Sequence, residues 1–299
     1  MNRTASPAIA FAVAAAGIGF FSLMDAAMKD LVIALGAYNA VLWRNMIGSA
    51  LTGVLFVGTK AAWPQIAVLR LHAWRSAVVA VMAISFFWAL GRLPLAEAIG
   101  LSFIAPVIAL YLAALLLGEK IGREAIIASI AGLGGVIVIL FGKFSGDYDA
   151  EALWGVAAVL FSAVVYAYNL VLARQQAQVA GPVEIAFFQN LLVSAVLMLT
   201  GPWLLTPLAL DKLPMLTAAA ALAIIALLLL SWAYARAEAQ ILIPVEYTAF
   251  VWAALFGWMF FAEPVTVWTV AGTALIVAGS LVAARAKSFP ANHIEITST

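Results

Sequence analysis

Cysteine is missing from this 299-residue chain, and histidine occurs only twice, as His72 and His293. Without cysteine the chain can form no disulfide, has no thiol nucleophile and cannot bind a metal through thiolates. The two histidines are far apart in the sequence, and His293 falls in a polar tail. We therefore expect neither a metal site nor a cofactor.

Charge is scarce as well, since only 10% of the residues are charged while 66% are hydrophobic. Soluble domains carry about 25% charged residues, and a soluble protein of this size could not bury so much apolar surface. Lipid must therefore surround most of the chain. The net charge of +1 and the lack of a basic stripe give no reason to expect a nucleic-acid partner. The apolar run from Pro7 continues into a full span, so we expect no cleaved signal peptide.

Ten apolar segments are long enough to cross a bilayer at about 20 residues each. They cover residues 8–34, 37–58, 72–91, 95–117, 124–142, 152–173, 182–203, 213–235, 240–261 and 265–285. The longest polar link, Lys143 to Glu151, divides the chain into two halves of five segments. The predicted fold class is an all-α integral membrane protein with ten transmembrane helices.

The distribution of cations predicts the orientation of these helices. An even number of crossings places both termini on one side, and ten cations fall on that side against four on the other. The ten are Arg3, Lys60, Arg70, Arg75, Lys120, Arg123, Arg174, Arg236, Arg285 and Lys287, and the four are Lys29, Arg92, Lys143 and Lys212. The positive-inside rule therefore predicts a multi-pass inner-membrane protein with both termini in the cytoplasm.

The two halves repeat one another in sequence. Trp88, Arg92 and Glu119 recur as Trp232, Arg236 and Glu263, all shifted by the same number of positions. Weaker matches follow in the same order: Trp43-Arg44-Asn45 with Phe188-Gln189-Asn190, Phe21-Ser22 with Phe161-Ser162, Lys29 with Asn169, and Gly135 with Gly279. Because each half has five helices, the two must insert in opposite orientations, as in inverted-repeat transporters. We place the repeats at residues 1–145 and 146–287, followed by a cytoplasmic tail, 288–299.

These features resemble a known family. Two halves of five helices, Pro106 in the fourth helix, and the endings Gly118-Glu119-Lys120 and Ala262-Glu263-Pro264 are similar to the drug/metabolite transporter superfamily of the EamA type. Within it, the chain looks most like the YddG-type exporters of amino acids and other metabolites. The resemblance implies a basket-like bundle with a central cavity lined mainly by helices 1, 3, 4, 6, 8 and 9.

Ionisable residues inside a span are costly and are candidates for function. Asp25 and Arg44 lie at similar depths on either side of the turn at Leu35-Gly36. One interpretation is a structural ion pair between helices 1 and 2, which the neutral Val165 and Gln189 of the second repeat favour. The alternative makes Asp25 a cavity carboxylate for a substrate amine or a proton.

Glu246 follows Pro244 near one end of helix 9. Proline frees a carbonyl one turn earlier, so an unwound segment beside this carboxylate could bind an amine or a proton. The alternative is a solvent-exposed glutamate at a frayed helix end. For Glu119 and Glu263 we predict capping or hinge roles.

The remaining candidates are polar and aromatic side chains expected to face the cavity. We predict that the substrate-binding set comprises Asp25, Glu246, Ser22, Ser85, Trp88, Ser102, Tyr166, Asn169 and Trp252. Such a surface, with few fixed charges, suits a neutral or zwitterionic solute. We predict that the hinge or structural set comprises Pro106, Pro244, Arg44, Glu119, Glu263, Gly135 and Gly279. The small residues of helices 5 and 10 favour close helix packing in lipid.

The sequence favours one of three functions. The favoured one is a secondary transporter that exports amino acids, aromatic ones included, by alternating access as a monomer or weak homodimer. The alternative is an uptake transporter for a metabolite such as S-adenosylmethionine or riboflavin, as in related families. An intramembrane enzyme would need paired carboxylates, a histidine cluster or a Ser-Lys or Ser-His pair at one depth, and none is evident. Gly53 to Lys60 has Thr59 and Lys60 in the wrong order for a phosphate loop.

Overall fold

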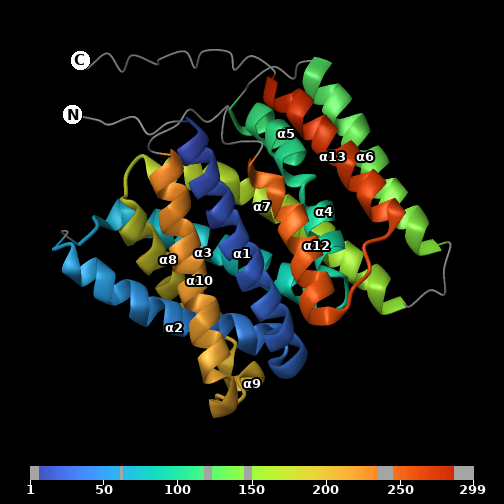
Figure 1. The fold of residues 1–299 in the computed structure, drawn as a ribbon. Helices are drawn as coiled ribbons and strands as arrows, with labels where there is room; N and C mark the ends of the chain where they lie inside the picture. The colour runs from blue at the N-terminus through green and yellow to red at the C-terminus, as the bar shows by residue number, and fades with distance from the viewer. Residues whose placement is uncertain (1–6, 61–62, 118–122, 145–149, 235–244, 286–299) are drawn as a thin grey trace, which may run out of the picture.

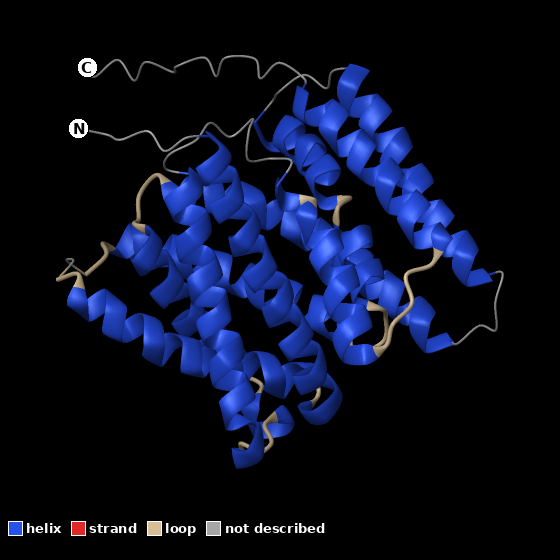
Figure 2. Ribbon diagram, viewed as in Figure 1, coloured by secondary structure: helices blue, strands red, loops and turns tan. Residues whose placement is uncertain are grey.

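The computed structural model describes residues 7–60, 63–117, 123–144, 150–234 and 245–285. Within these ranges every regular element is helical (Figure 2). The helices are α1 Pro7–Leu35, α2 Ala37–Gly58, α3 Ile66–Leu90, α4 Leu95–Ser102, α5 Ala105–Leu117, α6 Arg123–Phe144, α7 Ala150–Ala177, α8 Pro182–Met198, α9 Gly201–Leu204, the 3-10 helix η1 Leu210–Lys212, α10 Leu213–Tyr234, α12 Thr248–Phe261 and α13 Val267–Arg285. Helices satisfy their own backbone groups, which lipid requires.

Five of these helices, α1, α2, α3, α7 and α10, are long and apolar enough to cross a membrane. Five shorter apolar helices accompany them: Leu95–Ala109, Ser129–Gly142, Pro182–Met198, Thr248–Phe261 and Val267–Gly279. They fall in the remaining predicted spans. The protein is therefore a multi-pass membrane protein, and α1 begins at the side of the bundle where α13 ends (Figure 1).

Helices of the first half pack mainly against helices of the second. The contacts join α1 with α10, α3 with α7, α2 with α8, α4 with α12 and α6 with α13 (Figure 1). In the two repeats, α1 corresponds to α7 and α3 corresponds to α10. When each helix is replaced by its counterpart in the other half, the α1–α10 contact becomes the α3–α7 contact. The other three contacts map onto themselves. This pattern fits the two-repeat architecture.

Glycine allows α6 and α13 to approach closely. A Cβ atom on Gly135 would lie 2.4 Å from the carbonyl oxygen of Gly272, and one on Gly272 would lie 2.5 Å from that of Gly135. The two backbones therefore touch, as small residues permit in membranes. The outer faces of this pair carry exposed apolar side chains, among them Ile130, Ile137 and Val267, which suit contact with lipid.

The fourth predicted span is broken into α4 and α5. The amides of Phe103 and Ile104 bond to Gly100 and Leu101, each only three residues earlier, so the helix tightens and stops. Pro106 follows at the second position of α5. Proline cannot donate the next helical hydrogen bond, and its ring collides with the carbonyl one turn before it. The break expected from Pro106 is therefore present just ahead of it.

Candidate functional site

Two interrupted helices meet in the bundle. The first half is interrupted at Phe103, and in the second half Tyr247 forms a turn between Val245-Glu246 and the start of α12 at Thr248. The Phe103 and Tyr247 rings meet edge to face, with centroids 5.2 Å apart. The two residues occupy matching positions of the two repeats. Discontinuous helices at a repeat interface are where many transporters bind substrate and ions.

Opposite charges interact with one side chain near this junction. Glu246 stands immediately before the turn and is exposed, and Arg75 of α3 is half-buried. Tyr166 of α7, with 37% of its surface exposed, interacts electrostatically with both of them. A cation, a phenol and a carboxylate from three helices thus face a common region. The sequence predicted Tyr166 and Glu246 as site residues but did not include Arg75.

Neutral oxygen atoms on α7 hold Arg75 in place. Its Nε donates a hydrogen bond of 2.9 Å to Oδ1 of Asn169, and its Nη1 donates to Oε1 of Gln176. The sequence analysis counted Arg75 among the cations on the side of the termini, and the structure shows that its side chain is half-buried and bonded to α7. Its position one turn after His72, on the same helical face, is the signal that could have revealed the site.

His72 extends this network toward α8. The imidazole is fully buried, its Nε2 lies 3.1 Å from Oε1 of Glu184, and its Nδ1 contacts the Gln176 amide. The ring stacks on Phe188, with centroids 5.0 Å apart. Glu184 also lines a pocket of about 450 Å³. Gln176 and Glu184 could not be chosen from the sequence, because nothing local to either residue links it to α3.

An ion pair lies at the end of the bundle where α1 leads into α2, away from the His72 network. Lys29 Nζ donates a hydrogen bond of 2.5 Å to the carbonyl of Leu93 and pairs with Glu263 Oε1. Glu263 Oε2 accepts a hydrogen bond of 2.7 Å from the Leu95 amide at the start of α4. Ala262 adopts a left-handed conformation with φ 51°, which is strained for a residue with a Cβ atom. We call Lys29, Glu263, Leu93 and Leu95 the hairpin-end latch.

Trp88 lies away from the Arg75 and Glu246 region. Its indole packs beneath the Arg92 guanidinium, 3.5 Å from the ring centroid, and Arg92 Nε donates a 2.7 Å bond to Glu151. These three residues line a pocket of about 590 Å³ together with Val32, Ile33, Gly36, Ala37 and Gly91. The structure therefore places Trp88 at the end that holds the hairpin-end latch.

The predicted ion pair between Asp25 and Arg44 is not formed. Neither a hydrogen bond nor a salt bridge joins these two described residues, although their charges attract one another. The guanidinium instead donates to Oδ1 of Asn45 at 3.3 Å, approaches the Met24 sulfur at 3.8 Å and lies over the Phe87 ring at 6.0 Å. Similar depth along the helices did not bring the two side chains into direct contact, because other acceptors lie nearer.

The three serines predicted to bind substrate are accounted for by their own helices or by burial. Ser85 and Ser102 donate to carbonyls of their own helices, those of Val81 and Ala98, and Ser22 is buried. Glu119 and Pro244 lie outside the described residues.

Trp252 packs between helices. A Cβ atom on Gly19 of α1 would lie 3.1 Å from its indole, and Trp252 stacks on Phe256 of its own helix. On the neighbouring face of α12, Ala253 and Gly257 are buried, and a Cβ on Gly257 would meet Leu95 of α4. Within the described residues no group of three or more His, Cys, Asp or Glu side chains could hold a metal.

Comparison with known families identifies this architecture. The model of the EamA-like transporter family matches residues 7–141 and again residues 153–285. The chain belongs to the EamA-like transporter family. This family lies within the drug/metabolite transporter superfamily, so the protein is a membrane transporter with a small-molecule substrate. The two matched stretches also follow the two halves seen in the fold.

Named relatives share most of their length with this EamA-like transporter. It is 28% identical to the pseudopaline exporter CntI from two strains of Pseudomonas aeruginosa, over 89% of this chain and 93% of that one. It is 25% identical to a riboflavin transporter of Brucella anthropi, over 80% and 84% of the two chains. A solved crystal structure with 20% identity superposes with a TM-score of 0.62 over 97% of this chain and 99% of the other, which supports the fold alone.

Proposed function

We propose that this transporter exports small zwitterionic metabolites, amino acids among them, across the inner membrane by alternating access. The proposal includes ten crossings in two inverted repeats, residues 1–145 and 146–287, with both termini in the cytoplasm. The observation that carries it is the electrostatic interaction of one phenol, Tyr166, with both the Arg75 guanidinium and the Glu246 carboxylate. A guanidinium and a carboxylate facing one region complement a solute that carries both charges.

Each group has a defined part in binding. Arg75 binds the carboxylate of the solute through its guanidinium, whose planar array of N–H donors matches two oxygens. Glu246 binds the ammonium group, and the Tyr166 hydroxyl hydrogen-bonds to the solute between them. The edge-to-face pair of Phe103 and Tyr247 supplies an aromatic wall, which suits amino acids with aromatic side chains.

The hairpin-end latch supports alternating access. Lys29, Glu263 and the Leu95 amide tie α1, α12 and α4 together at one end. Under the proposed topology this end faces the outside. Release of solute there requires the ion pair to separate, so the latch acts as the outer gate, and the arrangement described corresponds to a closed gate.

Relatives bear on the direction of transport. The name pseudopaline exporter favours export. The name riboflavin transporter favours a flavin as the solute of the second candidate function, which is uptake of a metabolite such as riboflavin or S-adenosylmethionine. The opposite charges of Arg75 and Glu246 favour the zwitterionic solute over the neutral ring system of a flavin.

Transport in proteoliposomes tests the assignment. Vesicles are loaded with labelled amino acids, riboflavin or S-adenosylmethionine, and both efflux and uptake are measured with the orientation of the protein determined. We expect amino-acid transport by the native protein and at least about tenfold slower transport by Glu246→Gln and by Arg75→Gln, because each loses one charge-assisted contact. Trp252→Phe, which changes a packing residue, is the matched control and should transport nearly normally.

Two results would decide against the proposal. Normal amino-acid transport by Glu246→Gln at every pH tested would remove Glu246 from the site. Riboflavin transport by the native protein without amino-acid transport would establish the second candidate instead.

A further inference from the structure

The hydrogen bonds around His72 determine where its proton lies. Arginine has only donors, so the Gln176 atom that faces Arg75 must be the amide oxygen. The Gln176 nitrogen therefore faces His72, and Nδ1 of the imidazole must accept its hydrogen bond. The ring proton is then on Nε2, where it is donated to Glu184 over 3.1 Å. His72 is held neutral in this arrangement.

A second proton on His72 is incompatible with the Arg75 contact. Protonated Nδ1 would present an N–H to the amide NH₂ of Gln176, which places two donors against each other. Turning the amide by half a rotation brings its oxygen to His72. The NH₂ group then faces the Arg75 guanidinium, which also has only donors, and the bond between Arg75 and Gln176 is lost. The proton and this bond exclude each other.

The charged groups in this network are few. Arg75 comes from α3 and Glu184 from α8, while the described α7 side chains that take part, Gln176 and Asn169, are neutral. Tyr166 of α7 is titratable but faces Arg75. Glu184 is the carboxylate in direct contact with the His72 ring.

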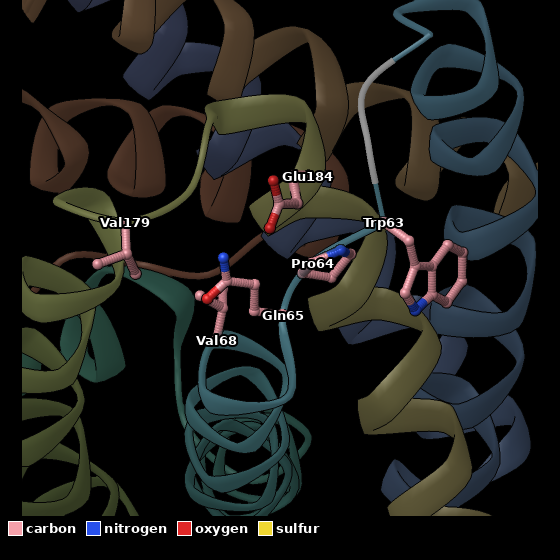
Figure 3. A pocket seen from close by; sticks show the side chains of 6 residues that line it. All are labelled: Trp63, Pro64, Gln65, Val68, Val179 and Glu184. Atoms are coloured by element: carbon pink, nitrogen blue, oxygen red, sulfur yellow. The ribbon is translucent and has the colours of Figure 1, made fainter.

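The Glu184 side of this network borders a pocket. Figure 3 shows the Glu184 carboxylate between Val179 and Pro64, near Gln65 at the start of α3. The Glu184 side chain retains 17% of its exposure while that of His72 retains none. A proton from solution therefore meets a carboxylate that directly contacts the buried imidazole. Under the proposed topology the pocket faces the cytoplasm.

We propose that His72, Gln176 and Glu184 form a proton-binding site that controls Arg75. One proton is taken up from water, one N–H bond forms at Nδ1 of His72, and no other covalent bond changes. Arg75 is then released from Gln176 while it keeps Asn169, and a freed N–H becomes available to a substrate carboxylate. Proton and substrate therefore bind together. The second part of this inference rests on the proposed function, because it takes Arg75 as the group that binds the solute.

Nitrogen NMR of the histidines tests the proton site without transport. In His293→Gln the labelled chain has a single histidine, His72. At the higher pH we expect the neutral tautomer with the proton on Nε2, and on acidification a second proton on Nδ1, so that the ring becomes doubly protonated. A tautomer protonated on Nδ1 at the higher pH, or a ring that stays neutral at the lower one, would overturn the site.

Transport kinetics test the control of Arg75. We expect the apparent KM for an amino acid to be at least about fivefold lower at about pH 6 than at about pH 8, which corresponds to a modest coupling between sites. In Gln176→Glu the carboxylate accepts from both Arg75 and His72, so Arg75 stays bound and the ratio should fall to about one. The same change at exposed Gln175 is the matched control and should keep the pH response.

The two measurements separate the two proposals. The expected tautomer and titration without any amino-acid transport would leave the proton site standing and reject the proposed function. Amino-acid transport with an equal KM at both pH values, or with the same pH response in Gln176→Glu, would reject the control of Arg75 by His72.

Discussion

Arg75 and Arg44 show two ways in which one guanidinium is kept inside an apolar bundle. Arg75 donates to amide oxygens on a neighbouring helix. Arg44 has one amide oxygen, a methionine sulfur and an aromatic face, and its Nε has no hydrogen-bond partner. An unsatisfied buried donor costs about 1–3 kcal/mol. Arg44 is therefore less well accommodated, and the nearby charge of Asp25 matters more to it.

A double-mutant cycle measures the interaction free energy between Asp25 and Arg44. Asp25→Asn or Arg44→Gln alone should destabilise the protein by about 3 kcal/mol, because each leaves the other charge uncompensated in low dielectric. The double variant leaves neither charge uncompensated, so it should be no less stable than either single variant, which corresponds to a coupling of about 3 kcal/mol. Thermal unfolding in detergent gives the values.

The exposed pair of Arg92 and Glu151 is the control for this cycle. The Glu151 side chain is 61% exposed, and exposed ion pairs contribute little. Arg92→Gln and Glu151→Gln should therefore be nearly additive. Simple additivity in the Asp25 and Arg44 cycle as well would show that these two charges do not stabilise one another.

At the scale of helices, the hairpin-end latch joins three elements through one carboxylate. Glu263→Gln should weaken it, because an amide replaces the charged partner of Lys29 and only one oxygen remains to accept. In this cysteine-free chain a single Ser102→Cys then reports access. We expect an impermeant thiol reagent outside to label it about tenfold faster in Glu263→Gln.

Glu151→Gln is the control for the latch. It removes an ion pair at the same end of the bundle but leaves Lys29 and Glu263 untouched. Labelling of Ser102→Cys should be unchanged in that background. Equal labelling rates in all three proteins would mean that the latch does not limit access from this end.

The contact between α6 and α13 gives a second prediction for helices. Gly135→Ala should destabilise the protein by about 2 kcal/mol, because the new methyl group meets backbone that cannot move aside cheaply. Gly58→Ala at the end of α2 meets nothing within 4 Å and should stay within about 1 kcal/mol of the native stability. Thermal unfolding compares the two, and equal stabilities would contradict close packing at Gly135.

For the whole molecule, the orientation in the membrane is testable with single cysteines. Leu210→Cys in η1 should react with an impermeant reagent added outside intact cells, whereas Gln65→Cys should react only after the membrane is opened. Both native residues are exposed. Arg75 and Lys29 bond within the bundle, and without them nine cations remain on the predicted cytoplasmic side and three on the other. The expected orientation is therefore unchanged. The reverse labelling pattern would overturn it.

The helices and the repeat could be predicted because their signals are local. Long apolar runs give spans, and Trp88 with Trp232 or Glu119 with Glu263 give the register of the two halves. The break near Pro106 follows from the chemistry of one residue. Contacts between distant helices carry no such signal. Lys29 and Glu263 are separated by 234 positions, and nothing in the composition near either residue indicates the other.

In the candidate site, too, the residues with a local sequence signal could be predicted and those defined by distant contacts could not. Tyr166 and Glu246 could be chosen because a polar group inside a span is conspicuous. Gln176 and Glu184 could not, since they lie near helix ends, where polar residues are ordinary. Their importance comes from His72 on a third helix, and only the packing of α3 against α7 and α8 reveals it.

Because the chain is a repeat, the hairpin-end latch bears on the relative free energies of two conformations of the transporter. If the opposite state arises when the two halves exchange conformations, every contact is replaced by its counterpart. Phe103 and Tyr247 are each other's counterparts, so their contact persists. Lys29 and Glu263 exchange with Asn169 and Glu119, and an amide then stands in place of an ammonium group. The charged contact is the stronger one. Under the proposed topology and mechanism, the resting equilibrium would therefore favour the state that is closed outside and open to solute from the cytoplasm, as the proposed export requires.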